Sequence, residues 1–212
     1  MKKIILLILI LINCLLYIPT IAQSRKLILN NLIIVIDPGH GGKDVGTSFD
    51  DIYEKDINLS ISLLLKKELE SYGANIILTR EGDYDLSTPN ATLRKKSDFN
   101  NRIKLINESN ADLVISIHQN YYKDSKYSGT QIFYKDSKEI ADYLQSNINQ
   151  DRLSKPISNS LYMYRNINTK VLLIECGFLS NYHDRITLTN KEYQKKYSAS
   201  LAKYISEYYK NN

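Results

Sequence analysis

"LIIVIDPGHGGKDVG", residues 32–46, joins an apolar run to a loop that carries four glycines and one histidine, His40. The apolar run, residues 32–36, has the length and composition of a fully buried strand. Glycine is scarce in the chain, with 8 in 212 residues. Four glycines so close together indicate a backbone that turns tightly or approaches another group closely. The stretch therefore predicts a buried strand that ends in a loop built to present His40.

Strand and helix patterns alternate along the rest of the chain. Apolar residues at helical spacing predict a helix over residues 54–72, which Gly73 ends. Further strands are expected at residues 75–79, 112–118, 130–134, 160–164 and 171–175, and further helices at 95–109, 136–149 and 192–209. The sequence therefore predicts a single-domain α/β fold, with a twisted, mostly parallel sheet flanked by helices.

The first residues have the pattern of a targeting segment. Lys2 and Lys3 precede an apolar stretch over residues 4–18, and residues 20–22 offer the small side chains that a signal peptidase reads. A cleaved signal peptide and a retained membrane anchor both fit residues 1–22, because the apolar part is only just long enough to span a bilayer. We therefore expect an exported protein, secreted or held at the outer face of the cytoplasmic membrane, with membrane contact only through this segment.

The composition fits one domain after this segment. With 43% hydrophobic and 24% charged residues, the chain can bury a full-sized core. We expect a short linker over residues 23–31 and a folded domain over residues 32–210. Loss of residues 1–22 removes two lysines and no acid, so the formal charge falls from +5 to +3, which does not call for nucleic acid as a partner. Only Cys176 remains, which excludes an internal disulfide.

Four reactive side chains stand where the predicted strands end. His40 follows the first strand, His118 and Glu175 each end a later strand, and Glu54 begins the first helix. Because the carboxyl ends of parallel strands meet at one edge of a sheet, we expect these two imidazoles and two carboxylates to converge there.

Two histidines and one carboxylate are a common ligand set of catalytic zinc, and they leave one position for water. The metal lowers the pKa of that water to about 7, and a further carboxylate then accepts its proton. Glu175 suits this role. The alternative is that each histidine caps its own loop, but convergence with two acids favours the metal site. No phosphate-binding G-x-G-x-x-G pattern and no H-E-x-x-H helix is present.

Several stretches together resemble one known family. They are "VIDPGHGGKDVG", "EKDINL", "LTREGD", Arg102 and Asn107 before "ADLVISIHQN", "LLIECGFLSN" and "EYQKKYSASLAKYI". In this order, from about residue 32 to residue 209, they are similar to the zinc-dependent N-acetylmuramoyl-L-alanine amidases, also called amidase type 3. The resemblance implies that residues 32–210 form an amidase catalytic domain.

This resemblance also implies a site and a reaction. Zn²⁺ is expected on His40, Glu54 and His118, with Glu175 as the catalytic acid and base. The expected reaction is hydrolysis of the amide bond between N-acetylmuramic acid and L-alanine, and the expected partner is a peptidoglycan glycan strand with its stem peptides. Two alternatives stay open: a zinc peptidase that cuts within the stem peptide, and a non-catalytic wall-binding protein.

A narrower resemblance points to the spore-cortex, germination-specific branch of the family. It is carried by "YDLSTPNATLRKKSDFNNRIKLIN", "SGTQIFY" and "LYMYRNINTKVLLIE", and by the lack of wall-binding repeats. The branch implies removal of stem peptides in the spore cortex ahead of muramic-δ-lactam formation, in the forespore intermembrane space, with an activating partner protein. Vegetative cell-wall turnover is the alternative.

Two residues depart from the family pattern. Gln119 stands where a small apolar residue is usual, and we expect it to line the cleft. Cys176 stands where leucine is usual. It should point to the opposite face of its strand from Glu175, as a small buried side chain.

Other polar residues near the motifs have structural roles in our interpretation. Arg80 and Arg102 are expected as ion partners more than as substrate contacts. His183 is expected on a loop or at a helix start, away from the metal. One of Asp37 and Asp44 is expected to orient the His40 imidazole.

Overall fold

The computed structural model describes residues 27–212, so the predicted targeting segment, residues 1–22, lies outside the described residues. The described chain folds around one six-stranded sheet with the strand order β4-β1-β5-β8-β6-β7. The strands are β1 (Ile33–Pro38), β4 (Asn75–Leu78), β5 (Leu113–Asn120), β6 (Gln131–Lys135), β7 (Lys155–Pro156) and β8 (Val171–Phe178). All neighbours are parallel except β6 and β8. The predicted mostly parallel sheet is confirmed.

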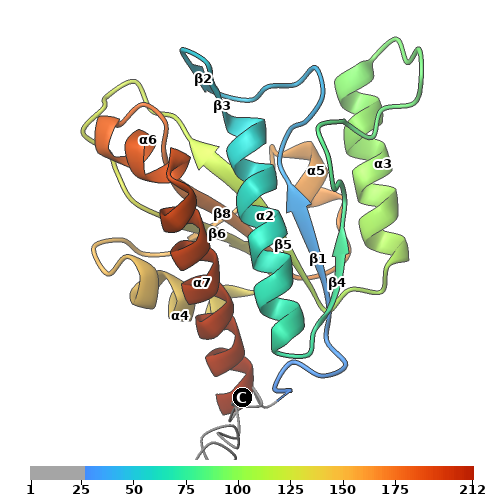
Figure 1. The fold of residues 1–212 in the computed structure, drawn as a ribbon. Helices are drawn as coiled ribbons and strands as arrows, with labels where there is room; N and C mark the ends of the chain where they lie inside the picture. Colours follow the sequence, from blue (N-terminus) through green and yellow to red (C-terminus); the bar gives the residue numbers. More distant parts are fainter. Residues whose placement is uncertain (1–26) are drawn as a thin grey trace, which may run out of the picture.

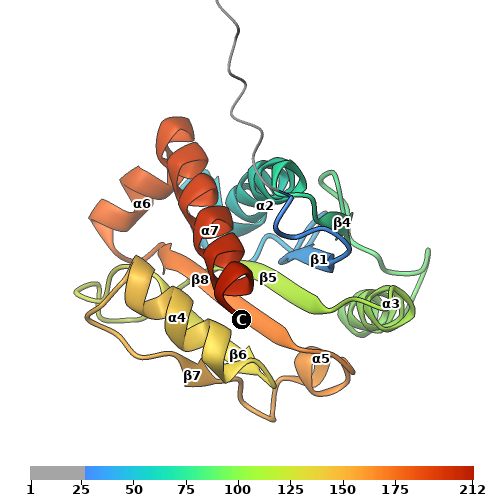
Figure 2. The ribbon, with the colours of Figure 1, turned by 90° about the horizontal axis from the view of Figure 1, so that it is seen from below.

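Helices cover both faces of this sheet (Figures 1 and 2). They are α2 (Glu54–Ser71), α3 (Arg94–Glu108), α4 (Lys138–Ile148), α5 (Tyr162–Arg165), α6 (Tyr182–Thr189) and α7 (Lys191–Asn211). The larger core cluster joins α2, α4 and α7 to one face, and the smaller one joins α3 and α5 to the other. No helix in the described part of the chain has both the length and the apolar character that a membrane span requires.

Helix α2 forms where the sequence predicts it. Ile57, Ile61, Leu65 and Leu69 recur every four residues and are at most 5% exposed. Burial of each such side chain contributes about 1.5–3 kcal/mol, which fixes this face of α2 on the sheet. The chain then reverses at Gly73, whose φ of 98° suits glycine.

Alternation along the central strands decides which side chains face which helices. On β5, Ile115 and Ile117 enter the α2 and α7 core, so His118 points to the α3 and α5 face. On β8, Cys176 is 2% exposed within the α2 and α7 core, so Glu175 points the other way. The predicted position of Cys176 is confirmed.

The sequence prediction was wrong at residues 160–164. They were expected as a strand, but the chain forms the short helix α5, with Met163 and Tyr164 buried under α3. A short apolar run does not distinguish a strand from a single helical turn by its spacing. The antiparallel direction of β6, helix α6 and a small hairpin of β2 (Ser48–Phe49) and β3 (Ile52–Tyr53) were not predicted either.

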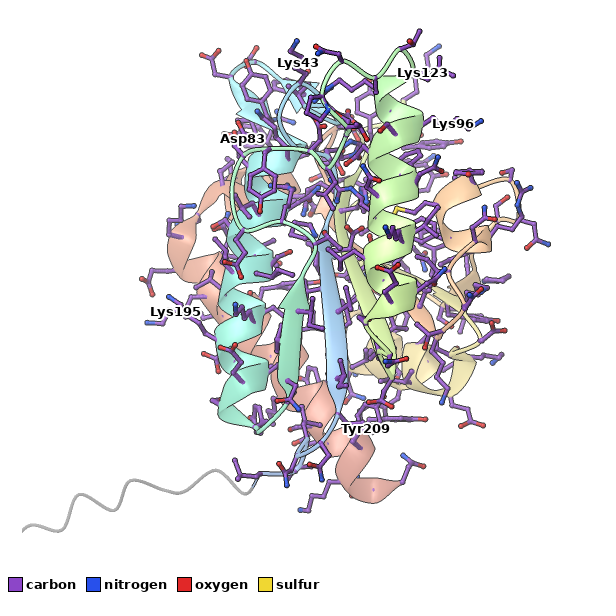
Figure 3. All side chains as sticks on the ribbon, turned by 90° about the vertical axis from the view of Figure 1, so that its right-hand side faces the viewer. Lys43, Asp83, Lys96, Lys123, Lys195 and Tyr209 are labelled. Atoms are coloured by element: carbon purple, nitrogen blue, oxygen red, sulfur yellow. The ribbon has the colours of Figure 1, made fainter. Side chains whose placement is uncertain are left out.

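The carboxyl ends of the parallel strands lie at one end of the molecule. Lys43, in the loop after β1, and Lys123, in the loop after β5, both lie at this end, far from Tyr209 near the end of α7 (Figure 3). The loops that carry the candidate site residues therefore gather on one edge of the sheet.

Candidate metal centre

The side chains predicted to converge do so. His40 follows β1, Glu54 is the first residue of α2, and His118 lies near the end of β5. One ligand-type atom from each lies within 4.8 Å of the others. His118 and Glu175 are register partners on the adjacent strands β5 and β8. Residues 14 to 135 positions apart in the sequence thus meet at one edge of the sheet.

Distances within the cluster suit a shared ion. His118 Nδ1 lies 2.9 Å from Glu54 Oε1, and His40 Nε2 lies 3.3 Å from Glu54 Oε2. The two imidazole rings are 5.0 Å apart between centroids and nearly perpendicular, at 76°. Two nitrogen or oxygen ligands of a tetrahedral zinc ion are separated by about 3.4 Å. The donor set and its spacing therefore fit a zinc-type metal ion.

Glycines make room for this cluster. A Cβ at Gly39 would lie 2.2 Å from Cε1 of the His118 ring. A Cβ at Gly46, where φ is 69°, would lie 2.6 Å from Glu54 Oε2 and 2.7 Å from His40 Cδ2. Real Cβ atoms do not approach this closely, so the two positions require glycine. This explains why the chain concentrates glycine in one loop.

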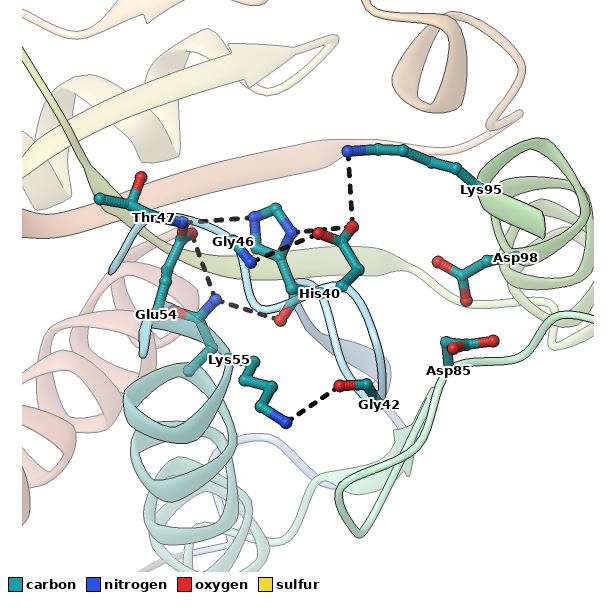
Figure 4. A network of polar contacts seen from close by, with 12 residues as sticks. His40, Gly42, Gly46, Thr47, Glu54, Lys55, Asp85, Lys95 and Asp98 are labelled. Carbon is teal, nitrogen blue, oxygen red and sulfur yellow. Dashed lines mark hydrogen bonds and ion pairs between the residues drawn. The ribbon is translucent and has the colours of Figure 1, made fainter. Parts of the chain in front are cut away.

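Asp44 is the acid that faces His40. Gly41 and Asp44 exchange two backbone hydrogen bonds, and this tight turn brings Asp44 Oδ2 to 3.0 Å from His40 Nδ1. Lys95 from α3 lies 3.4 Å from the same carboxylate (Figure 4). Burial lowers the pKa of His40, but Asp44 and Glu54 outweigh it and raise that pKa to about 9. Of the two aspartates named in the sequence analysis, Asp44 is the one that lies beside this imidazole.

Glu54 is held from several directions. Its Oε2 accepts from the backbone N–H of Thr47 at 2.8 Å, and its Oε1 accepts from Asn58 Nδ2 at 3.3 Å and from the Gln119 backbone N–H at 3.1 Å. Burial would raise the pKa of Glu54, but His118 and His40 hold it well below its usual value. The carboxylate is therefore fixed and ionised.

Gln119 does not line the cleft, contrary to our expectation. It is 2% exposed, and its amide donates to Asn58 Oδ1 at 3.1 Å. The reason is strand alternation, because the neighbour of His118 must point to the opposite face of β5. Gln119 therefore acts beneath the cluster, through Asn58 and its own backbone N–H.

Glu175 stands beside the cluster in a small pocket. The pocket has a volume of about 220 Å³ and is lined by Asp37, Gly39, His40, Phe99, Arg102, His118, Leu161, Tyr162, Met163, Tyr164, Leu173 and Glu175. Part of Glu175 is open to the pocket, but its Oε2 is buried and has no hydrogen-bond partner among residues 27–212. Burial raises the pKa of Glu175 to about 7; His118 and His40 oppose this rise, and the charge of Glu54 adds to it. A carboxyl with this pKa can both accept and donate a proton near neutral pH.

Both arginines are buried; Arg102 is an ion partner, as predicted, whereas Arg80 donates to backbone carbonyls. Arg80 and Arg102 are each 1% exposed, and Arg102 pairs with Asp37 and Asp98. His183 is exposed near the start of α6 and is not part of the cluster.

Sequence reasoning missed three residues of the site. Asn58 lies one helical turn after Glu54, and this i, i+4 spacing was the signal that could have found it. Ser116 lies two positions before His118, so it shares the same face of β5 and donates to Asp37 Oδ2 at 2.9 Å. The contact of Thr47 with Glu54 depends on the β2–β3 hairpin, which gave no clear pattern.

The fold and the site together describe an enzyme with a mostly parallel α/β sheet and a candidate metal centre at the carboxyl ends of its strands. The family described as N-acetylmuramoyl-L-alanine amidase matches residues 34–207, and the chain belongs to that family. It is a peptidoglycan amidase.

Individual relatives agree with this assignment. The germination-specific N-acetylmuramoyl-L-alanine amidase of Bacillus subtilis (strain 168) is 38% identical, over 85% of this chain and 81% of the relative. Among solved structures, the CwlD amidase from Clostridioides difficile, in complex with the GerS lipoprotein, has a TM-score of 0.81 and 36% identity over 86% of this chain and 100% of that chain. An N-acetylmuramoyl-L-alanine amidase from Clostridium difficile 630 has a TM-score of 0.72 and 30% identity, over 84% of this chain and 97% of that chain.

Proposed function

We propose that this amidase is zinc-dependent and that His40, Glu54 and His118 hold the ion. The observation that carries the proposal is the meeting of these three donors within 4.8 Å, beside a buried carboxyl, Glu175, that has no partner for its Oε2 in the described chain. Two histidines and a carboxylate leave one coordination position open, as catalytic zinc sites do. Gly39 and Gly46 keep the space around the donors free.

The reaction is hydrolysis of the amide bond between N-acetylmuramic acid and L-alanine. When bound, the zinc ion polarises the scissile carbonyl and lowers the pKa of water. Glu175 accepts a proton from the attacking water and then delivers it to the amine nitrogen of the leaving L-alanine. A pKa of about 7 suits a group that must do both. Asp44 and the contacts of Glu54 keep the donors in place.

A digest of purified peptidoglycan tests this reaction. The amidase should release intact stem peptides that begin with L-alanine and leave muramic acid without stems, as read by mass spectrometry. Cuts within the stem peptide would favour the zinc peptidase instead. Absence of any product with zinc present would favour a non-catalytic wall-binding protein.

The substrate in the cell is, in our proposal, the glycan of the spore cortex, whose stem peptides are removed ahead of muramic-δ-lactam formation. The similarity to a germination-specific amidase and to CwlD supports this assignment. Spores of a deletion strain should then retain stem peptides and contain little or no lactam. Normal lactam content would reject the cortex role and favour vegetative cell-wall turnover, with the amidase chemistry unchanged.

We also propose export and an activating partner protein. The pattern of residues 1–22 supports export to the outer face of the membrane or beyond, including the forespore intermembrane space. The complex of CwlD with the GerS lipoprotein supports a partner. Cell fractionation should place the protein outside the cytoplasm, and sequencing of its N-terminus distinguishes cleavage after Ala22 from a retained anchor.

A further inference from the structure

We propose that Arg102 is a positioning residue of the metal centre, whose guanidinium holds the His40 loop in the conformation that turns the imidazole toward Glu54 and His118. The inference rests on the proposed zinc site, since it concerns how the chain presents one of the ligands. Arg102 comes from α3 and lies 62 positions from His40 in the sequence.

The backbone of His40 is strained. Its φ is 62°, in the left-handed region that costs an L-residue with a side chain about 1–2 kcal/mol. Such a conformation persists only where the surroundings hold it. The carbonyl oxygen of His40 accepts a hydrogen bond from Arg102 Nη2 at 2.7 Å, so a charged donor fixes the peptide that follows the strained residue.

The same guanidinium also reaches the end of β1 and its own helix. Arg102 Nη1 donates to the Pro38 carbonyl at 2.9 Å and to Asp37 Oδ1 at 2.7 Å. Its Nε donates to both carboxylate oxygens of Asp98 at 3.1 Å. One planar group therefore ties β1, the His40 loop and α3 together, which the rigid fork of arginine permits and the single ammonium of lysine does not.

A second buried arginine supports the adjacent peptides. Arg80 donates to the carbonyls of Pro38 and Gly39, each at 3.0 Å, and to that of Lys55 at 2.8 Å. The carbonyls of three consecutive residues, 38, 39 and 40, thus all accept from buried guanidinium groups. Within residues 27–212, Arg102 alone bonds to the carbonyl of His40 itself, so the inference names Arg102.

The charge of Arg102 is already balanced within the protein. Asp37 is 1% exposed and also accepts from Thr79 Oγ1 at 2.6 Å and Ser116 Oγ at 2.9 Å. Burial would raise the pKa of Asp37, but Arg102 and Thr79 keep it below its usual value, so Asp37 stays ionised. Asp37 and Asp98 both pair with Arg102 and neutralise its positive charge, so the guanidinium does not attract a substrate anion. The geometry therefore favours positioning over a substrate contact.

The variant Arg102→Lys tests the inference, because it keeps the charge beside Asp37 and loses the fork. Zinc affinity of the purified protein, measured by competition with a chromogenic chelator, should fall about 10–100-fold, as for other residues that support metal ligands. At saturating zinc, kcat should recover and KM should stay unchanged. The matched control is Arg185→Lys, whose arginine stacks on Phe49 and lies outside the site; its zinc affinity should equal that of the wild type.

The outcomes separate this inference from the proposed function. Wild-type affinity for zinc in the lysine variant overturns the positioning role and leaves the zinc site intact. A raised KM at saturating zinc also overturns it, because that result indicates a substrate contact. If the wild-type protein itself does not bind zinc, the proposed metal centre fails and the inference with it. If the lysine variant does not fold, Asp37→Asn/Asp98→Asn/Arg102→Gln removes Arg102 together with both of its paired acids, and the same loss of zinc affinity is expected.

Discussion

The carboxylate of Asp44 lies 3.0 Å from Nδ1 of His40, on the side of the ring away from the Nε2 that faces Glu54. This is the arrangement in which an acid orients a metal-binding imidazole and leaves its other nitrogen free for the ion. The tight turn between Gly41 and Asp44 brings the two side chains together, and Lys95 from α3 lies 3.4 Å from the same carboxylate.

Asp44→Asn should therefore weaken zinc binding about 10–100-fold at pH 9. The loss should be smaller at pH 7. Asp44 helps to raise the pKa of His40 to about 9, so below that pH a proton competes with zinc for the wild-type imidazole. The variant loses part of this competition, which offsets part of its weaker binding. Chelator competition at both pH values measures this. Asp50→Asn, at the exposed tip of the β2–β3 hairpin, is the control. Unchanged affinity of Asp44→Asn at pH 9 would show that His40 needs no such partner.

Glu175→Gln should keep the metal and lose the reaction. The amide cannot accept a proton from water, so kcat should fall about 10²–10⁴-fold, the usual contribution of a general acid or base. Turnover of purified peptidoglycan and zinc content should be measured on the same preparation. The control is Glu192→Gln on the exposed start of α7. Near-normal turnover would remove Glu175 from its role.

The stability of the metal-free protein should depend on pH through Glu175. Its pKa is about 7 in the folded protein and 4.5 when unperturbed, so between these values the folded state binds more protons than the unfolded state. Stability should therefore fall as the pH rises from 4.5 to 7. Relative to Glu175→Gln, the free energy of unfolding of the wild type should fall by about 1–3 kcal/mol between pH 4.5 and pH 7. This range lies below the full value of the pKa shift, because water in the pocket screens the charge. Denaturant unfolding at pH 4.5 and 7 tests this, and a constant difference between the two proteins would contradict it.

Gly39→Ala should disrupt the cluster by volume alone. Its Cβ would lie 2.2 Å from the His118 ring, so the ring or the loop must shift, at a cost of about 1–3 kcal/mol and with loss of zinc affinity. Gly82→Ala is the matched control, because its Cβ would meet only the partly exposed Tyr84 ring at 3.2 Å. Thermal unfolding and zinc titration of the two variants should differ clearly. Equal behaviour would mean that the site tolerates a side chain at position 39.

The position of the site followed from the sequence because its determinants are local. Apolar runs identify buried strands, and the residue that ends each run falls at the sheet edge, which places His40, His118 and Glu175. The first residue of α2 places Glu54. These inferences need only the strand ends and the parallel direction of the strands.

The contacts that support the site could not be predicted from the sequence, because they join segments that are far apart in the chain. Arg102 reaches Asp37 across 65 positions, and no local pattern marks that pairing. Gln119 was placed in the cleft although strand alternation beside His118 already excluded it. Part of the strand predicted at residues 160–164 proved to be α5, whose Tyr164 hydroxyl lies 3.1 Å from Ser116 Oγ, a contact that no local pattern marks.

The central claim is that His40, Glu54 and His118 form one zinc site, and metal content tests it most directly. The purified protein, dialysed against trace zinc and measured by mass spectrometry of the metal, should hold close to one zinc per chain. His118→Ala should lose most of it, since two protein ligands hold the ion poorly. His183→Ala, which removes an exposed histidine outside the cluster, should retain it. Full zinc retention in His118→Ala would contradict the account.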